Sequence, residues 1–442
     1  MAEATFNFPR GFMWGTATSS HQVEGNNHNN TWWAWEQEPG RIAGGDTSGL
    51  ACDWWGGRWR QDFDRAAESG QNAHRLSIEW SRVQPKPNRW NEAALDRYRQ
   101  MLRGLHERGM RPVVTLHHFS DPLWLAEQGG WENPRTITHF AVYASRVVEA
   151  LKSYADIWVT INEPNVFATL GYVLGLFPPG KRDLNAAFQV MTNMAKAHAS
   201  TYHAIHAIQP QAQVGLAVNY RGFDPARPWF PPDQFSAGLL SRLYNNFFPQ
   251  AAKNGDLRFI TKHRKLPQAK NTLDFLGINY YTAENVSFAP LSPAELFCRR
   301  AFPVGADLSP SGDIANRPEG LFHALKWGLG FGVPIIVTEN GVEDSADRLR
   351  PRYLAQHIRH LWRAVNFNYP IKGYFHWSLV DNFEWHNGWT QRFGLWELDT
   401  ETQARRKRSS ADLYAAICKQ NALSSEMVAK FAPELLKTMF PG

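Results

Sequence analysis

Cysteine is scarce in this sequence, and long apolar runs are missing from it. The three cysteines, Cys52, Cys298 and Cys418, lie far apart, so they form neither a disulfide framework nor a metal-ligand spacing. Free thiols are typical of a reducing compartment. No run approaches 18 consecutive apolar residues, and residues 1–12 lack a basic segment followed by an apolar stretch. We therefore expect a cytoplasmic protein with no signal peptide, no membrane association and no metal or cofactor.

Dense positive charge is lacking too. The net charge of +6 and the pI of about 9.1 are a weak excess for 442 residues. The one dense basic run is 405–408. A nucleic-acid site needs more such clusters, interleaved with aromatic residues. We therefore interpret the run as a solvated loop and expect no nucleic-acid partner.

The sequence also lacks interdomain linkers and internal repeats. No Gly- or Ser-rich segment divides the 442 residues, and no short motif recurs. Barrels of alternating strands and helices often exceed 250 residues as one domain when their loops carry insertions. We expect a single domain over residues 1–442 with a closing segment at about 421–442, where 423–440 resembles an amphipathic helix. The sequence leaves the oligomeric state open.

Short apolar runs without period-two alternation recur along the chain, as expected for parallel strands that are covered on both faces. The clearest runs are 112–116, 157–161, 214–218, 273–278 and 334–337, and further candidates are 73–78, 371–377 and 12–16. Helical patterns lie between them. Leu95, Tyr98, Leu102 and Leu105 form one apolar stripe before Gly109, and a second helix is predicted near 137–154.

The alternation of strand and helix, repeated about eight times, indicates an α/β fold, either a (β/α)₈ barrel or a doubly wound sheet. On a barrel, the Pro-, Ser- and Gly-rich segment 288–316 would be an extended βα loop on the active-site face. The 19 tryptophans pack mostly in the core, but aromatic faces also suit the apolar faces of sugars.

Two carboxylates are singled out by their position. Glu163 follows the run 157–161, and Glu339 follows the run 334–337. Barrel enzymes place catalytic groups at the carboxyl ends of strands. Glycoside hydrolysis needs two carboxyl groups, one to protonate the leaving oxygen and one to attack or to activate water. Taken alone, each glutamate could equally cap the start of a helix.

Several segments of the chain, from about residue 8 to 417, resemble family 1 of the glycoside hydrolases, the β-glucosidase family. TINEP (160–164) resembles the acid/base motif of that family, and VTENG (337–341) resembles its nucleophile motif. FMWGTAT (12–18) with QVEG (22–25) resembles the N-terminal signature, and NFEW (382–385) with RFGL (392–395) the C-terminal one. The resemblance implies a (β/α)₈ TIM barrel and a retaining enzyme whose two carboxyl groups stand roughly 5 to 5.5 Å apart.

The resemblance also implies roles for individual residues. Glu339 would be the ionised nucleophile, hydrogen-bonded by Tyr281, and Arg75 would hold its pKa down. Glu163 would be the acid/base, with a pKa raised by an apolar setting or by the charge of the nucleophile. Asn162 would bind the sugar 2-hydroxyl. The residues that would contact the sugar are Gln22, His118, Asn162, Trp377, Glu384 and Trp385, with Trp377 as the floor.

Three positions depart from the family pattern. Phe119 and Ser120 stand where the family usually has tryptophan and aspartate, and Ile314 replaces a tryptophan that commonly walls the aglycone side. The reacting groups are unaffected, but the aglycone preference is put in doubt.

The function that these patterns predict is hydrolysis of terminal non-reducing β-D-glucosides through a covalent glycosyl-enzyme. The partner is a small β-glycoside or an oligosaccharide; galactosides and fucosides stay open as substrates, and so does the balance between hydrolysis and transglycosylation. One alternative is a 6-phospho-β-glycosidase, which Glu384 disfavours because its charge would repel a phosphate. The other is a catalytically inactive sugar-binding barrel.

Overall fold

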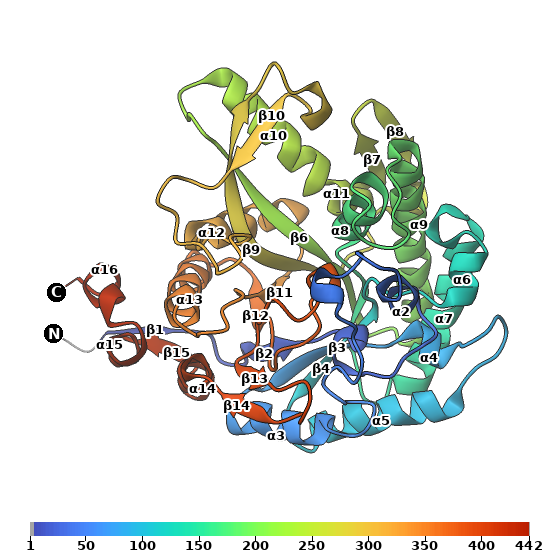
Figure 1. Cartoon of the computed structure of the whole chain (residues 1–442), viewed down its shortest axis with the longest axis horizontal. Coiled ribbons are helices and arrows are strands. Elements are labelled where there is room, and N and C mark those ends of the chain that lie inside the picture. The colour runs from blue at the N-terminus through green and yellow to red at the C-terminus, as the bar shows by residue number, and fades with distance from the viewer. Residues whose placement is uncertain (1–3, 442) are drawn as a thin grey trace.

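A closed parallel β-barrel lies at the centre of the computed structural model, which describes residues 4–441 (Figure 1). Each barrel strand pairs in parallel with the next, and the last strand pairs with the first. The eight strands are β2 (Met13–Ala17), β3 (Ala73–Ser77), β4 (Arg111–His117), β5 (Ile157–Asn162), β6 (Gln213–Pro225), β9 (Phe275–Phe288), β11 (Ile335–Asn340) and β12 (Ile371–His376). The predicted strands are confirmed, and the barrel rather than the doubly wound sheet is correct.

The burial of the strands explains their sequence pattern. Every residue of β5 and of β11 is buried. Side chains that point into the barrel and side chains that point toward the helices are both removed from water, so neither strand alternates between polar and apolar residues.

Long helices connect the strands and contact one another around the barrel (Figure 1). They are α3 (Trp59–Glu68), α5 (Glu92–His106), α7 (Arg135–Leu151), α9 (Leu184–Ile208), α11 (Phe247–Asn254), α12 (Pro318–Gly328), α13 (Arg350–Asn366) and α14 (Ser409–Gln420). The predicted stripe is the buried face of α5, and Gly109 follows that helix in the left-handed region at φ 70°. Short helices follow several strands: α1 (Ser20–Val23), α2 (Thr31–Glu36), α4 (Trp80–Val83), α6 (Leu123–Glu127) and α8 (Pro164–Ala168).

Strands β6 and β9 continue past the barrel as a paired extension (Figure 1). β10 (Cys298–Ala301) adds to β9 in antiparallel register, and α10 (Pro231–Tyr244) packs against β6 and β9. The segment 288–316 is therefore not loop throughout, because it contains β10. Its later part does lie at the carboxyl ends of the strands, as predicted.

The prediction of one closing helix over 423–440 is wrong. The chain forms β15 (Ala422–Ser424), paired with β1 (Thr5–Asn7), then α15 (Ser425–Phe431) and α16 (Leu436–Met439). Pro433 disfavours helical backbone at Ala432, which has φ −148° and ψ 59°.

The basic run 405–408 is not a solvated loop either. Arg405–Lys407 is strand β14, paired with β13 (Trp396–Leu398), and Arg408 is buried against Asp381. Each of the four cations has an acidic partner.

A further antiparallel pair, β7 (Asp256–Phe259) with β8 (Lys262–Lys265), lies apart from the barrel sheet. Within residues 4–441, no helix has the length and apolar character needed to cross a membrane.

Candidate active site

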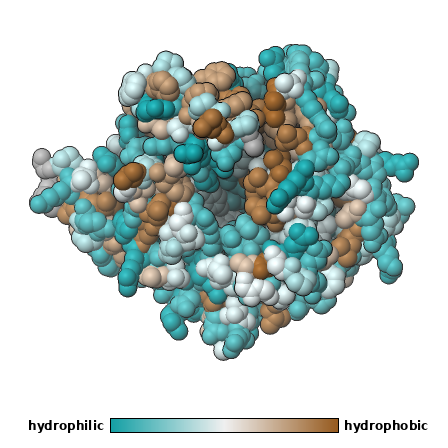
Figure 2. Space-filling model, turned by 45° about the horizontal axis from the view of Figure 1, so that its top comes forward, coloured by the Kyte–Doolittle hydropathy of each residue, from teal (hydrophilic) through white to brown (hydrophobic). Residues whose placement is uncertain are grey.

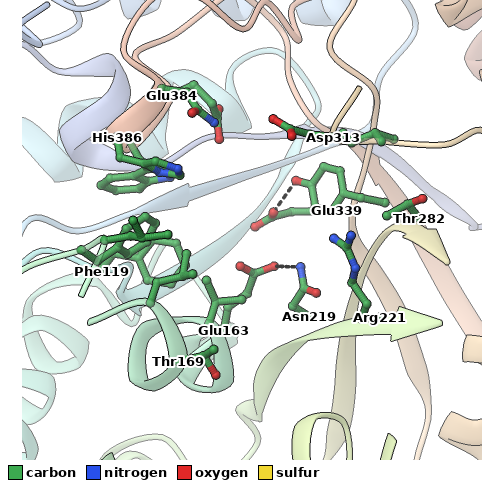
Figure 3. A pocket seen from close by; sticks show the side chains of 18 of the residues that line it. Phe119, Glu163, Thr169, Asn219, Arg221, Thr282, Asp313, Glu339, Glu384 and His386 are labelled. Carbon is green, nitrogen blue, oxygen red and sulfur yellow. Dashed lines mark hydrogen bonds between the residues drawn. The ribbon is translucent and has the colours of Figure 1, made fainter. Parts of the chain in front are cut away.

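A cavity of about 490 Å³ opens at the carboxyl ends of the barrel strands. Figure 2 shows a hollow on this face of the molecule with hydrophobic residues along its rim. Both Glu163, which directly follows β5, and Glu339, near the end of β11, line the cavity. Their side chains face the same space in Figure 3. The closed barrel thus brings together the two carboxylates that the sequence singled out.

Glu339 is held by a cation and a hydroxyl group. Arg75, on β3, donates from Nη1 to Oε1 of Glu339 over 2.5 Å, and Tyr281, on β9, donates from its hydroxyl to Oε2 over 2.7 Å. Arg75 is fully buried and also donates to Asn162 and Thr115, on β5 and β4. The guanidinium therefore ties together the ends of four barrel strands around one carboxylate.

Glu163 has different neighbours. Its Oε1 accepts hydrogen bonds from the side-chain amides of Asn219 and Asn279, over 2.9 and 2.8 Å, and it forms no ion pair in the described chain. The backbone of Glu163 has φ 44°, a left-handed conformation that is rare for a residue with a side chain. Pro164 then begins α8, where its missing N–H costs nothing. Strained backbone conformations are enriched at active sites, where the surrounding structure holds them in place.

The surroundings of the two carboxyl groups set their protonation. Burial raises the pKa of Glu163 to about 8, and the negative charge of Glu339 adds to the rise. Burial also raises the pKa of Glu339, but the Arg75 guanidinium and the Tyr281 hydroxyl oppose that rise. The predicted influence of Arg75 has the right sign, although burial outweighs it. The raised pKa of Glu163 agrees with the prediction.

Other predicted residues line the same cavity: His118, Trp377, Glu384 and Trp385. Burial lowers the pKa of His118 well below its usual value, so its imidazole is neutral. Burial, followed by the charge of Glu339, raises the pKa of Glu384 to about 8. Glu384 is therefore mostly protonated at neutral pH, and its expected repulsion of a phosphate is weaker than the sequence suggested.

Gln22 and Asn162 lie behind the cavity wall, fully buried. The amide nitrogen of Gln22 donates to Glu384 over 3.3 Å, and it also donates to Asn382 and to the carbonyl oxygen of Phe383. The amide nitrogen of Asn162 contacts Nε2 of His118 over 3.0 Å. Both residues thus touch the side chains that line the cavity.

Asn219 and Asn279 were not predicted as site residues, yet both contact Glu163. A signal for Asn219 existed. It directly follows the run 214–218, as a polar residue at the carboxyl end of a buried strand. Asn279 stands beside the predicted Tyr281 and also accepts a hydrogen bond from Thr338 over 2.6 Å. With its oxygen on Thr338, the amide of Asn279 presents its nitrogen to Glu163.

The model of glycosyl hydrolase family 1 matches residues 4–423. The chain belongs to glycosyl hydrolase family 1. "Beta-glucosidase A" of Thermotoga maritima is 32% identical over 94% of this chain and 98% of its own length. "Beta-galactosidase" of Pyrococcus woesei is 30% identical over 97% of this chain and 100% of its own length. This family 1 protein is therefore a glycoside hydrolase of the β-glycosidase type.

Solved structures of family 1 proteins share the whole fold. A β-glycosidase from Pyrococcus horikoshii has a TM-score of 0.89 with 35% sequence identity and covers 97% of this chain and 98% of its own. The Thermotoga maritima β-glucosidase in complex with glucoimidazole also has a TM-score of 0.89, at 31% identity, and covers 95% of this chain and 100% of its own.

The three departures from the family 1 pattern lie at or near the cavity. Phe119 lines it, in a left-handed conformation at φ 67°, and packs edge-on against Trp385. Ile314 lines it as well and is 7% exposed. Ser120 turns away and donates to Glu79 over 2.8 Å. Phe119 and Ile314 therefore change the surface that a substrate meets, whereas Ser120 belongs to a buried polar network.

Proposed function

We propose that the protein is a retaining β-glycosidase that hydrolyses terminal non-reducing β-D-glucosides and related β-galactosides or β-fucosides. The observation that carries the proposal is the contrast between two buried carboxyl groups in one cavity. Glu339 contacts a guanidinium, whereas Glu163 contacts only neutral amides and has a pKa of about 8. One group suits a nucleophile, and the other suits an acid that still holds its proton at neutral pH.

The reaction would proceed in two displacements. An oxygen of Glu339 attacks the anomeric carbon, while Glu163 transfers its proton to the glycosidic oxygen and the C–O bond to the aglycone breaks. Glu163 is then an anion. It next takes a proton from a water molecule, whose oxygen attacks the anomeric carbon and displaces Glu339. The sugar leaves with its original configuration, and Glu163 is protonated again.

The inner cavity would hold the terminal sugar. We assign its floor to Trp377 and its hydrogen-bonding groups to His118, Glu384 and Trp385. Gln22 would orient Glu384, since it donates to that carboxyl group. Asn162 would bind the sugar 2-hydroxyl through its amide nitrogen, which contacts Nε2 of His118 and has a second N–H.

The relatives support this class of substrate. They are named β-glucosidase and β-galactosidase, and the solved Thermotoga maritima β-glucosidase binds glucoimidazole and deoxynojirimycin. We also place the protein in a reducing compartment such as the cytoplasm, because Cys52, Cys298 and Cys418 are buried free thiols.

The test is hydrolysis of 4-nitrophenyl β-D-glucoside, with the first-formed sugar followed by proton NMR. A retaining enzyme releases β-glucose before mutarotation produces the α-anomer. Release of α-glucose first would contradict the retaining mechanism. Binding of glucose analogues without turnover of any β-glycoside would instead support the inactive sugar-binding barrel.

A further inference from the structure

An aliphatic stripe runs outward from Glu163 along the chain segment that follows it. Val166, Leu170 and Leu174 stand three, seven and eleven positions after Glu163, and all of them line the cavity. Residues at this spacing share one face of a helix. The chain here is α8 followed by a π-helical turn, Thr169–Val173. An apolar surface therefore begins beside the proposed acid and continues to the mouth of the cavity.

The outer end of this stripe is exposed. Leu174 is 43% exposed and its neighbour Leu176, which also lines the cavity, is 42% exposed, whereas Glu163 and Glu339 are 6% and 3% exposed. Large aliphatic side chains at the mouth of a cleft are the kind of exposed apolar surface that marks a binding site.

The loops that form the rest of the outer cavity also contribute apolar side chains. Phe223, on the β6 extension, and Ile314 line the cavity. A flat indole offers a stacking face to a second sugar ring, and an isoleucine offers none. The family-typical tryptophan is thus replaced by a side chain that suits aliphatic contacts.

The charged side chains of the outer cavity have polar partners. Arg221 and Arg300 both approach the same oxygen of Glu284, at 3.0 and 3.5 Å. Gln391 donates to Asp313 over 2.7 Å. These charged groups therefore already have partners, and the aliphatic stripe beside them offers a surface that needs none.

We propose that the outer cavity binds an apolar aglycone, such as an alkyl chain, in preference to a second sugar. The inference rests on the proposed function, because the aglycone leaves from the side of Glu163. The glycosidic oxygen would sit at Glu163, and the chain attached to it would lie along Val166, Leu170, Leu174 and Leu176. A sugar in the same place would lose hydration from the hydroxyls that face these aliphatic side chains, which return no hydrogen bonds.

The test compares kcat/KM for n-butyl β-D-glucoside, n-octyl β-D-glucoside below its micellar concentration, and cellobiose. The two alkyl alcohols are leaving groups of similar acidity, so a difference between their glucosides reports binding of the chain. Four additional methylene groups, partly removed from water, should raise kcat/KM by about tenfold or more. Cellobiose should be hydrolysed less efficiently than the octyl glucoside.

Substitutions of single residues test whether the stripe causes the preference for the longer alkyl chain. Leu174→Ser and Leu176→Ser should each lower the octyl-to-butyl ratio about threefold. Leu184→Ser is the matched control, because Leu184 is similarly exposed at 49% but lies outside the cavity, and it should leave the ratio unchanged. Ile314→Trp should shift the preference toward cellobiose.

Equal kcat/KM for the butyl and octyl glucosides, or a higher value for cellobiose, would overturn the aglycone assignment while leaving the β-glycosidase activity in place. Failure to hydrolyse any β-glucoside would refute the proposed function, and the aglycone assignment with it.

Discussion

Glu163 and Glu339 are the same residue type at equivalent places in the fold, yet the barrel surrounds them differently. Both end a fully buried strand and both face one cavity. The two oxygens of Glu339 accept hydrogen bonds from a guanidinium and from a phenolic hydroxyl. One oxygen of Glu163 accepts hydrogen bonds from two side-chain amides. The neighbours, not the residue type or the strand end, therefore distinguish the proposed nucleophile from the proposed acid.

The largest effect is expected from Glu339→Gln. The amide keeps the shape of the side chain but lacks the charged oxygen of the proposed nucleophile, so kcat for 4-nitrophenyl β-D-glucoside should fall by roughly 10⁴-fold or more. Steady-state kinetics with a freshly purified variant, free of wild-type enzyme, measure the loss. Retention of one per cent of the activity would contradict the role of Glu339.

Glu163→Ala should show a loss that depends on the leaving group. An alkyl glucoside needs protonation, so its kcat should fall by about 10²- to 10⁴-fold, whereas a 2,4-dinitrophenyl glucoside needs little help and its glycosylation should be nearly unaffected. Azide should restore turnover by attacking the glycosyl-enzyme, and the product should be the β-glycosyl azide. Formation of the α-azide would show that the two glutamates have the opposite roles.

A third carboxyl group in the cavity belongs to Glu384, which we assign to the part of the site that binds the terminal sugar. Among the residues that line the cavity, the only arginines or lysines are Arg221 and Arg300, and both are already paired with Glu284. A sugar 6-phosphate at Glu384 would lose water and gain no free cation, which should lower kcat/KM by about a thousandfold. Side-by-side assays of an aryl β-glucoside and its 6-phosphate measure the ratio. A preference for the phosphate would refute the assignment of Glu384 and Trp385.

The smallest effect concerns stability, and it should differ in sign between the two glutamates. The pKa of Glu163 is about 8 in the folded protein against 4.5 for an ordinary glutamate, so the folded state holds a proton that the unfolded state has released between these values. Stability from this group is complete below about pH 4.5 and is lost as the pH rises through 8.

Glu163→Gln removes this loss of stability at high pH, because the amide does not ionise. The amide oxygen can still accept the hydrogen bonds from Asn219 and Asn279. Its Tm should exceed that of the wild type by roughly 2 °C at pH 8 and by less at pH 5. Glu339→Gln should lower the Tm at pH 8, because it leaves the buried Arg75 cation without its partner. Calorimetry of both variants at pH 5 and pH 8 measures these changes in Tm. A change of the same sign in both variants at pH 8 would refute the inferred difference between the surroundings of the two glutamates.

The barrel strands and the two glutamates could be predicted because their signals are local. An apolar run without alternation predicts a buried parallel strand, and a carboxylate at its carboxyl end predicts a place at the site. The place of Asn219 after the run 214–218 is a signal of the same kind, but the contacts of Asn219 and Asn279 with Glu163 could not be predicted in this way. Their contacts with Glu163 join strands β6 and β9 to β5, so they exist only in the closed barrel.

Two other differences have physical causes. The closing segment breaks at Pro433, a signal present in the sequence that the apolar pattern concealed. The extension of β6 and β9 with β10 could not be predicted, because its pairing depends on which strands become neighbours. The pKa balance at Glu339 required three-dimensional burial as well as the identity of Arg75.

The buried guanidinium of Arg75 has a consequence for the order in which the protein assembles. Its partner Glu339 lies 264 positions along the chain, and its contact with Asn162 spans 87. A nascent chain that has not yet reached β11 contains the Arg75 cation but not the carboxylate that balances its charge. Contacts this distant close late and slowly. Recovery of activity during refolding should therefore trail the recovery of helical circular dichroism, because the helices form locally and the reacting pair meets only when the last strands join the first.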